Sequence, residues 1–561
     1  LVTVGPTVKG YPEAELTRIP SLEMQSLKSV PVVTDPVPFD AASKVDLVGN
    51  AYASFDFGTN LAGFPGVRIT CRKPTRLFIT FDEILSDNDV DCRRMGCVNI
   101  IDLKMPEGAY NFEAIEAYNF RYMKLVALDG DCTIDAISLR EYVNPDVQEA
   151  QFTASDPRLN RIFEAARETF RQNAVDLFMD CPSRERGAWL ADSLFTSRAG
   201  FDLCGDTRIE HNFFENYLLP EDFAYLPDGM LPMTYPADHP DGVFIPNFAL
   251  WFVPQLEEYA ARSGDRATVD ALKPRVLGVF EYFKKFKNED GLLEKLENWV
   301  FIEWSKAAGY VQDVSYPTNM LYAGALESAG RIYNMPELLQ EAKSVRDTVL
   351  RQSFDGKFFI DNAIRKDGKL EITTNRSEVC QYFAFYFNVV TPESHPELWK
   401  TLCEQFGPQR KETRAFPEID FANTLVGNML RMEILSRYGR SNQILDEVVG
   451  YLLYMAERTG TLWEMDDTSA SCNHGFASHA AHTLYRDVLG VRQIDPVNKV
   501  VKVRFTDANL PWCDGRIPAP DGYVDLRWTR EANTVKYHLS VPAGYRVEVE
   551  NPSNYTLQRE P

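Results

Sequence analysis

Apolar and polar residues alternate in short runs through the first part of the chain. Between about Val48 and Tyr142, runs such as 51–57, 67–71, 76–81 and 120–126 alternate with period two and are separated by turn residues. This pattern is typical of antiparallel strands with one buried face, and it predicts a β-sandwich over residues 48–145. Residues 1–47 are rich in proline and lack sustained periodicity. We interpret them as an extended lead-in or the remnant of an upstream module.

After Pro145 the hydrophobic period becomes helical, and Asp156-Pro157 forms a capping start. The pattern predicts helices at 157–176, 183–204, 206–219, 246–262, 265–287, 315–333, 336–351, 377–389, 393–405, 418–438, 441–456 and 475–488. Several, such as those around 318–325 and 422–429, are apolar or small on more than one face, which indicates burial on both sides. Alternating inner and outer helices of this kind favour a closed (α/α)6 toroid of six helical hairpins over residues 146–492.

Strand-like alternation returns from Asn498, in the runs 500–505, 522–528, 534–540 and 545–549. We therefore expect a smaller C-terminal β-sandwich over residues 493–561. The predicted fold class is a multidomain α and β protein, with the toroid flanked by the two sandwiches.

The charge balance excludes some classes of partner. The chain of 561 residues has 59 Lys+Arg and 81 Asp+Glu, for a formal net charge of −22. Such a balance argues against nucleic-acid binding and against docking on an anionic membrane surface. No uninterrupted apolar run approaches the roughly 18 residues that a membrane span requires.

The ten cysteines are scattered along the chain without a Cys-x-x-Cys pair or a Cys/His cluster of zinc spacing. We therefore expect no metal site and no cofactor, and the pattern leaves the disulfide status open. The chain begins with Leu1 and no leader pattern follows. We expect it to be a processed or trimmed product.

Residues 179–192 hold the densest group of chemically active side chains. If Pro182 opens a helix, Glu185, Trp189 and Asp192 fall on one helical face. Two carboxylates around an indole, with arginines beside them, could hold a sugar ring and donate a proton. Burial beside Trp189 would favour the protonated form of Glu185 that a general acid needs. The alternative is a capped helix start with ordinary ion pairs.

Two further segments combine tryptophan with acids. Residues 458–474 carry Trp463-Glu464 and Asn473-His474, which could supply a carboxylate base, a platform and a hydrogen-bond donor. Residues 297–304 form an aromatic and acidic cluster around Trp299. Exposed loop acids are usually only solvated, and a lone histidine is more often structural. In a toroid, however, the loops of one end converge on a common funnel.

These same residues carry a family resemblance. The run Asp180-Cys-Pro with Arg184-Glu185-Arg186 and Trp189 resembles the acidic signature of glycoside hydrolase family 78, the bacterial α-L-rhamnosidases. Residues 460–464 with 473–474 resemble the family's second signature, and residues 55–58, 61–63 and 119–122 resemble its sandwich. The lead-in at 15–20 resembles the family's entry to that sandwich, which suggests that a module precedes residue 1.

The resemblance implies an (α/α)6 catalytic toroid and hydrolysis with inversion. It implies Glu185 as the general acid and Glu464 as the base that activates water, about 6.5–9.5 Å apart. The residues that it implies in sugar binding are Asp180, Arg184, Trp189, Asp192, Trp299, Trp463 and His474.

The sequence departs from the family's pattern in two places. The stretch from Arg184 to Trp189 is one residue shorter between Arg and Glu, although the spacing from Glu185 to Trp189 is kept. A Gly-Asp-Trp expected near the third cluster is 297–299, Glu-Asn-Trp, which puts the exact sugar in doubt. Glu303 or Asp313 could take the place of the missing aspartate.

The leading hypothesis is an inverting, exo-acting α-L-rhamnosidase that releases terminal rhamnose from plant glycosides or complex polysaccharides. The alternatives are another inverting glycosidase on the same toroid, or a non-catalytic carbohydrate-binding protein on a degenerate scaffold. The expected partner is a rhamnose-containing oligosaccharide or glycoside. Such substrates are usually met outside the cytoplasm, so we expect a periplasmic or extracellular location. Linkage, aglycone and oligomeric state stay open.

Overall fold

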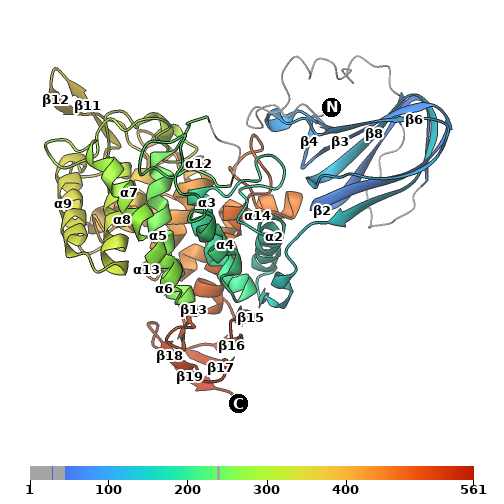
Figure 1. Ribbon diagram of the computed structural model, residues 1–561. Coiled ribbons are helices and arrows are strands. Elements are labelled where there is room, and N and C mark those ends of the chain that lie inside the picture. Colours follow the sequence, from blue (N-terminus) through green and yellow to red (C-terminus); the bar gives the residue numbers. More distant parts are fainter. Residues whose placement is uncertain (1–27, 30–43, 237–240) are drawn as a thin grey trace.

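The computed structural model describes residues 28–29, 44–236 and 241–561 of the chain. Most of the predicted lead-in at 1–47 lies outside these residues. The described chain is a mixed α and β protein with three regions in sequence order: strands, helices and strands again (Figure 1). The mixed fold class predicted from the hydrophobic pattern is confirmed at this level.

The N-terminal strand region is built on two long, bent strands. Its elements are β1 (Lys28–Ser29), β2 (Val45–Lys73), β3 (Thr75–Asp82), β4 (Leu85–Ser86), β5 (Asp89–Val90), η3 (Arg94–Gly96), β6 (Ile100–Met105), β7 (Gly108–Glu113) and β8 (Tyr118–Glu141). The main sheet has the order β1-β2-β8-β3-β6, and β7 pairs with β2. β2 pairs with β8 twice, from Val45 opposite Ile134 to Asp56 opposite Tyr122, and again from Phe64 opposite Arg140 to Cys71 opposite Cys132. We refer to residues 44–141 as the strand domain.

The period-two alternation predicted from the sequence matches the residues that are buried in the strand domain. Leu47, Ala51, Ala53 and Phe55 are each at most 1% exposed, and the residues between them are more exposed. Such period-two burial places one set of side chains in a core.

The helical region follows the predicted order closely. Its helices are α2 (Pro157–Asn173), α3 (Leu190–Cys204), α4 (Arg208–Asn216), α5 (Pro246–Ser263), α6 (Arg266–Ala271), α7 (Lys273–Lys284), α8 (Tyr316–Ile332), α9 (Pro336–Ser353), α10 (Glu378–Tyr386), α11 (Pro396–Gln405), α12 (Arg410–Thr413), α13 (Met429–Arg437), α14 (Ser441–Thr459) and α15 (His479–Leu484). Short 3-10 or π-helical turns are η4 (Asp146–Glu149), η5 (Lys306–Gly309), η6 (Thr424–Asn428), η7 (Gly475–Ser478) and η8 (Tyr485–Leu489). Short strands between them are β9 (Gln151–Ala154), β10 (Val314–Ser315), β11 (Asn362–Lys366) and β12 (Lys369–Ile372). Asp156 caps α2 by accepting a hydrogen bond from the Arg158 N–H, as the sequence predicts.

The helices predicted to be buried on more than one face are buried. In α8 every residue from Tyr316 to Leu326 is buried, and α3 is buried over most of its length. α3 starts later than predicted, however, at Leu190 rather than at residue 183.

The C-terminal region contains two small sheets. Its strands are β13 (Val491–Asp495), β14 (Val500–Arg504), β15 (Trp512–Ala519), β16 (Gly522–Glu531), β17 (Thr534–Ser540), β18 (Arg546–Glu550) and β19 (Thr556–Arg559). One sheet has the order β13-β14-β18 and the other β19-β17-β16-β15-β9. β9 precedes α2 in the chain, so a strand from before the helices completes the C-terminal sheet.

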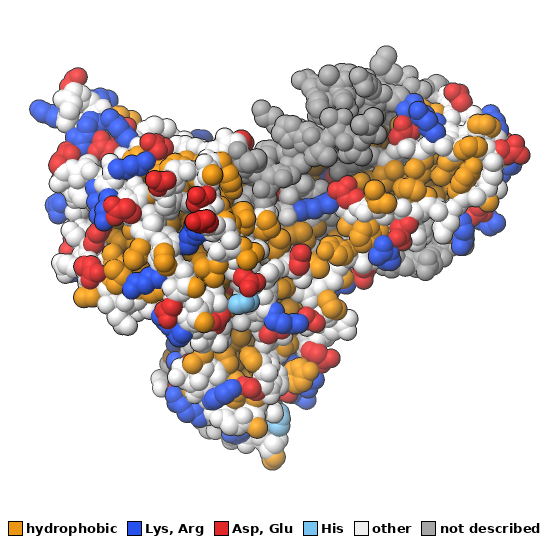
Figure 2. Space-filling model, in the orientation of Figure 1, with side chains coloured by type: hydrophobic (Ala, Val, Ile, Leu, Met, Phe, Trp, Pro, Cys, Tyr) orange, Lys and Arg blue, Asp and Glu red, His pale blue; other side chains and the backbone are white. Residues whose placement is uncertain are grey.

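The apolar residues form two cores. One runs without interruption through the helical and C-terminal regions, and the other lies inside the strand domain. Figure 1 shows the strand domain beside the helices and the last strands below them. On the face shown in Figure 2, basic and acidic side chains are interspersed, so the net charge of −22 is not gathered into one patch there.

Candidate active site

The segment after Asp180 is a loop held by non-local bonds. Asp180 N–H donates to the Gly187 carbonyl at 2.9 Å, and Gly187 N–H donates to Asp180 Oδ1 at 2.8 Å. Trp189 forms an isolated β-bridge with Thr234. Arg186 has a φ of +56°, which an α-helix does not allow. The loop therefore turns back on itself, and Trp189 is the residue that precedes α3.

This geometry corrects two sequence predictions. Glu185 and Trp189 lie outside the helix, so Glu185, Trp189 and Asp192 do not share a helical face. The side chain of Glu185 is 35% exposed, and Arg184 Nη2 lies 2.8 Å from its Oε1. The predicted burial of Glu185 beside the indole is therefore wrong, because the loop turns the carboxylate outward.

The second segment is the loop that follows α14. Gly460 ends the helix with a φ of +71°, and a side chain there would collide with Thr59 of the strand domain. Farther on, Glu464 N–H donates to the Ser471 carbonyl at 3.0 Å, and Ser471 N–H donates to Glu464 Oε2 at 3.3 Å. Glu464 is 5% exposed. Its carboxylate is thus fixed by the other arm of its own loop.

Arg184 joins the two candidate carboxylates. Its Nη2 lies 2.8 Å from Glu185 Oε1 and 3.3 Å from Glu464 Oε2. Because one nitrogen contacts both, these two oxygens lie no more than about 6 Å apart, which is closer than the roughly 6.5–9.5 Å expected between the carboxyl groups of an inverting pair. The structure therefore brings the two predicted catalytic glutamates to one place, although they come from opposite ends of the helical region.

His474 stands between two buried acids. Its Nε2 lies 3.0 Å from Asp192 Oδ1, and its Nδ1 lies 3.6 Å from Glu464 Oε2. Burial alone would lower the pKa of His474, but the two carboxylates outweigh that effect and raise its pKa well above the ordinary value. Burial also raises the pKa of Asp192, and the hydrogen bond to His474 offsets only part of this rise. This histidine is held as a buried hydrogen-bond donor.

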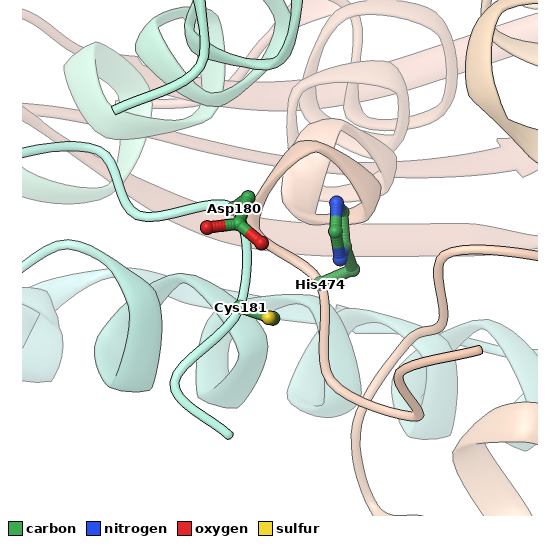
Figure 3. Close-up of side chains that lie close together, drawn as sticks. All are labelled: Asp180, Cys181 and His474. Atoms are coloured by element: carbon green, nitrogen blue, oxygen red, sulfur yellow. The ribbon is translucent and has the colours of Figure 1, made fainter. Parts of the chain in front are cut away.

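Asp180, Cys181 and His474 form a compact group (Figure 3). Their oxygen, sulfur and nitrogen atoms lie within 4.8 Å of one another, and all three residues are buried. Burial raises the pKa of Asp180 well above its ordinary value. Burial also opposes ionisation of Cys181, but the hydrogen bond to His474 outweighs it and lowers the pKa of the thiol.

A set of oxygen, sulfur and nitrogen donors is of the kind that binds zinc. The raised pKa of His474 keeps a proton on this member of the set, and Arg184 adds positive charge beside Asp180 and Cys181, so a divalent cation is disfavoured there. We therefore derive no metal chemistry from this group. Asp180 Oδ2 and His474 Nδ1 are buried and make no hydrogen bond to a nitrogen or oxygen atom among the described residues. The Cys181 thiol is hydrogen-bonded to His474, whose Nδ1 also lies 3.6 Å from Glu464 Oε2.

The predicted tryptophans divide into two kinds. Trp189 packs edge-on against Phe248, which packs against Phe301, and Phe301 contacts both Trp299 and Trp304. Trp299 and Trp304 are 36% and 37% exposed. A continuous aromatic row thus leads from Trp189 to an exposed pair of indoles.

Trp463 differs, because its side chain is completely buried and its Nε1 donates to Thr459 Oγ1 at 2.8 Å. Its ring packs edge-on against Tyr454, and this burial does not fit the predicted role in direct sugar contact.

The two candidates to replace the missing aspartate are held by other bonds. Glu303 is 0% exposed and accepts from Ser305 Oγ at 2.7 Å, while Asp313 Oδ2 accepts from the Arg365 N–H at 2.6 Å. Neither has a contact with Glu185 or Glu464 among these bonds.

Among residues 28–29, 44–236 and 241–561, helices of the length and apolarity needed to cross a bilayer are absent.

Sequence reasoning missed two buried residues of the strand domain, Glu83 and Arg94. Arg94 Nη1 donates to the Ala470 carbonyl at 2.7 Å, and Cys472 N–H donates to Glu83 Oε2 at 3.0 Å. Glu83 lies just after the alternating run 76–81, but this position does not show which distant loop it contacts, and Arg94 does not lie at the end of such a run.

Comparison with known proteins identifies a family for the helical region. Residues 147–488 match the family model of the bacterial alpha-L-rhamnosidase 6 hairpin glycosidase domain. The chain belongs to this family.

Two curated relatives of the chain are named alpha-L-rhamnosidases. One, from Alteromonas sp. (strain LOR), is 21% identical over 93% of this chain and 57% of its own length. The other, from Formosa agariphila, is 22% identical over 87% of this chain and 54% of its own length. The chain therefore spans about half the length of the curated relatives that it matches.

Solved structures show the same fold. The glycoside hydrolase family 78 rhamnosidase of Bacillus sp. GL1 aligns with a TM-score of 0.80 and 21% identity, covering 94% of this chain and 55% of that one. The rhamnosidase of Klebsiella oxytoca with rhamnose bound aligns with a TM-score of 0.64 and 19% identity, covering 78% of this chain and 88% of that one. The strand domain, helices and C-terminal sheets thus belong to a fold of known rhamnosidases.

Proposed function

We propose that this protein is an inverting α-L-rhamnosidase that releases terminal rhamnose from plant glycosides or complex polysaccharides. The observation that carries the proposal is the contact of Arg184 with both Glu185 and Glu464. Membership of the six-hairpin family and the names of the curated relatives support the choice of sugar.

The two glutamates differ in the way that an acid and a base require. Glu185 stands on an outward-turned loop, where the oxygen of a leaving group can reach it. Glu464 is buried and held by Ser471, so its carboxylate can orient a water molecule against the opposite face of the sugar. When substrate binds, Arg184 would give up its contact with one carboxylate and would contact the substrate or the water instead.

The surrounding residues fit the binding of a deoxy sugar. Asp180, Asp192 and His474 offer buried polar atoms for the ring hydroxyls. Trp189 and the exposed Trp299 offer apolar walls for the methyl group at C5. We leave Trp463 out of this set, since its side chain is completely buried.

We further propose that the helices close into an (α/α)6 toroid flanked by two β-sandwiches. The six-hairpin family match over 147–488 and the double pairing of β2 with β8 support this arrangement. Substrates of this size also favour a periplasmic or extracellular location.

The test is hydrolysis of an aryl α-L-rhamnoside by the wild type and by Glu185→Gln and Glu464→Gln. Each variant should lose about 100-fold or more in kcat, because loss of a positioned proton donor or acceptor removes roughly 10²–10⁴-fold. Proton NMR of the first-formed sugar should show the anomer inverted relative to the substrate.

Glu447→Gln is the matched control, since Glu447 is a buried glutamate that pairs with Arg431. It should keep its kcat. Release of another sugar but not rhamnose would support the alternative glycosidase. Binding of oligosaccharide without any hydrolysis would support a carbohydrate-binding protein and end the catalytic proposal.

A further inference from the structure

The strand domain contributes a buried ionic cluster that faces the helical region. Arg94 Nε lies 2.9 Å from Asp82 Oδ2, and Arg94 Nη2 lies 2.6 Å from Glu83 Oε2. Asp82, Glu83 and Arg94 are 0%, 1% and 8% exposed. Buried charges of this kind are costly unless they are fully bonded, so their contacts show where the cluster acts.

Most of the remaining bonds of the cluster go to a single loop. Arg94 Nη1 donates to the carbonyls of Ala470 at 2.7 Å and Thr468 at 3.1 Å. Glu83 Oε2 accepts from the Cys472 N–H at 3.0 Å, and its Oε1 lies 3.5 Å from the Ser471 hydroxyl. The strand domain thus binds both carbonyl groups and an N–H group of residues 468–472.

The same loop holds the carboxylate of Glu464. Ser471 N–H donates to Glu464 Oε2 at 3.3 Å, and the Ser471 carbonyl accepts from the Glu464 N–H at 3.0 Å. Ser471 therefore has Glu83 on one side and Glu464 on the other.

A second link runs beside the first. Asn119 Nδ2 donates to Glu83 Oε1 at 2.8 Å, and Asn473 Nδ2 donates to Asn119 Oδ1 at 3.0 Å. Asn473 precedes His474, so the strand domain also braces the start of the histidine segment.

We propose that Glu83 and Arg94 are positioning residues that fix the Glu464 carboxylate through the 468–472 loop. This inference rests on the proposed function of Glu464 as the base. The strand domain is then part of the catalytic apparatus, although it supplies no group that touches the reacting atoms. A displacement of about 1 Å in a reacting group costs roughly 10²-fold in rate, so bracing of this kind has a measurable effect on turnover.

The first experiment compares Glu83→Gln with Glu447→Gln in the full chain. Glu83→Gln keeps the shape but removes the charge that accepts from Cys472 and Arg94. We expect kcat to fall by about 10- to 100-fold with KM changed little, because the sugar contacts stay in place. Glu447→Gln breaks a buried pair whose arginine bonds the carbonyls of Leu402 and Phe406, far along the chain from the 468–472 loop, and should keep kcat.

The second experiment is a double-mutant cycle with an activated aryl rhamnoside as substrate. If Glu83 acts through Glu464, Glu83→Gln should cost little further activity in a Glu464→Gln background. An equal fold-loss in both backgrounds would overturn the inference, as would an equal loss of kcat in Glu447→Gln.

The third measurement does not depend on activity. Amide hydrogen exchange of a peptide covering residues 465–473 should be faster in Glu83→Gln than in wild type, and unchanged in Glu447→Gln. Unchanged exchange in Glu83→Gln would overturn the inference. A wild type that releases no rhamnose would refute the proposed function instead, and this exchange experiment would still decide whether Glu83 fixes the loop.

Discussion

Glu303 is a buried carboxyl group that forms no ion pair within the part of the chain that the structure describes. Its Oε2 accepts from the N–H groups of Asn423 and Gly427 at 3.2 and 3.1 Å, and Ser305 Oγ donates to Oε1. Burial raises the pKa of Glu303 to about 8, and these hydrogen bonds offset only part of the rise. The group is therefore mainly protonated near neutral pH.

This protonation predicts a pH dependence of stability. Because the pKa of Glu303 is higher in the folded than in the unfolded state, its contribution is complete below about pH 4.5 and is lost as the pH rises through about 8. Glu303→Gln keeps a neutral side chain and should remove that loss. The melting temperature of the variant should therefore rise relative to wild type between pH 6 and 9.

The exposed Glu404→Gln serves as the control, and its melting curve should parallel that of wild type. If Glu303→Gln also ran parallel to wild type over this pH range, Glu303 would be ionised in the folded protein.

At the scale of single residues, the sequence motifs predicted which side chains would come together at the site. Glu185, Glu464, Asp192 and His474 do meet, as the order of motifs predicts. The burial of Glu303 could not be predicted, because its partners come from residues more than a hundred positions later in the chain.

At the scale of elements, local periodicity predicted the helices, and non-local bonds decided the exceptions. Residues 183–189 have the composition of a helix start, yet the bonds of Asp180 with Gly187 and of Trp189 with Thr234 hold them as a loop. The strand β9 is short, and only its pairing with β15 fixes it in the C-terminal sheet.

β9 therefore ties the C-terminal sheet to the helices. Phe152 of this strand is 2% exposed, stacks on Phe163 of α2 at 5.2 Å and meets Tyr485 at 6.2 Å. Phe152→Ala should lower the free energy of unfolding by about 3–5 kcal/mol, the usual cost of removing a buried phenylalanine.

Urea unfolding of the full chain would measure this change. Gln151→Ala, on the exposed neighbour, should stay within about 0.5 kcal/mol of wild type. Equal effects of the two substitutions would mean that β9 does not join the two regions.

At the scale of the whole molecule, the sequence predicted three regions, whereas the apolar residues make two cores. The helical and C-terminal regions share one, because β9 and β15 pack on the helices. The strand domain has a core of its own, although one of its residues, Ile84, packs in the core of the helical region. A count of cores cannot be made from periodicity alone, because periodicity shows which face is buried but not which element covers it.

Apart from Ile84, the strand-domain residues named in the contacts with the helices are polar. Asn60 Nδ2 donates to Thr461 Oγ1 at 3.0 Å, and Gln172 Nε2 donates to the Asn60 carbonyl at 3.0 Å. Polar interfaces of this kind couple domains less strongly than a shared apolar core does. The two cores should therefore unfold separately.

Calorimetry of the full chain should accordingly show two transitions. Leu125→Ala, at a 0% exposed position of the strand core, removes about 2–5 kcal/mol and should lower one transition only. Phe152→Ala should lower the other. A single transition that both substitutions shift would mean that the bonds of Glu83, Arg94 and Asn60 join the two cores into one cooperative unit. Separate transitions would instead show that the strand domain, though it braces the 468–472 loop, is stabilised by its own interior.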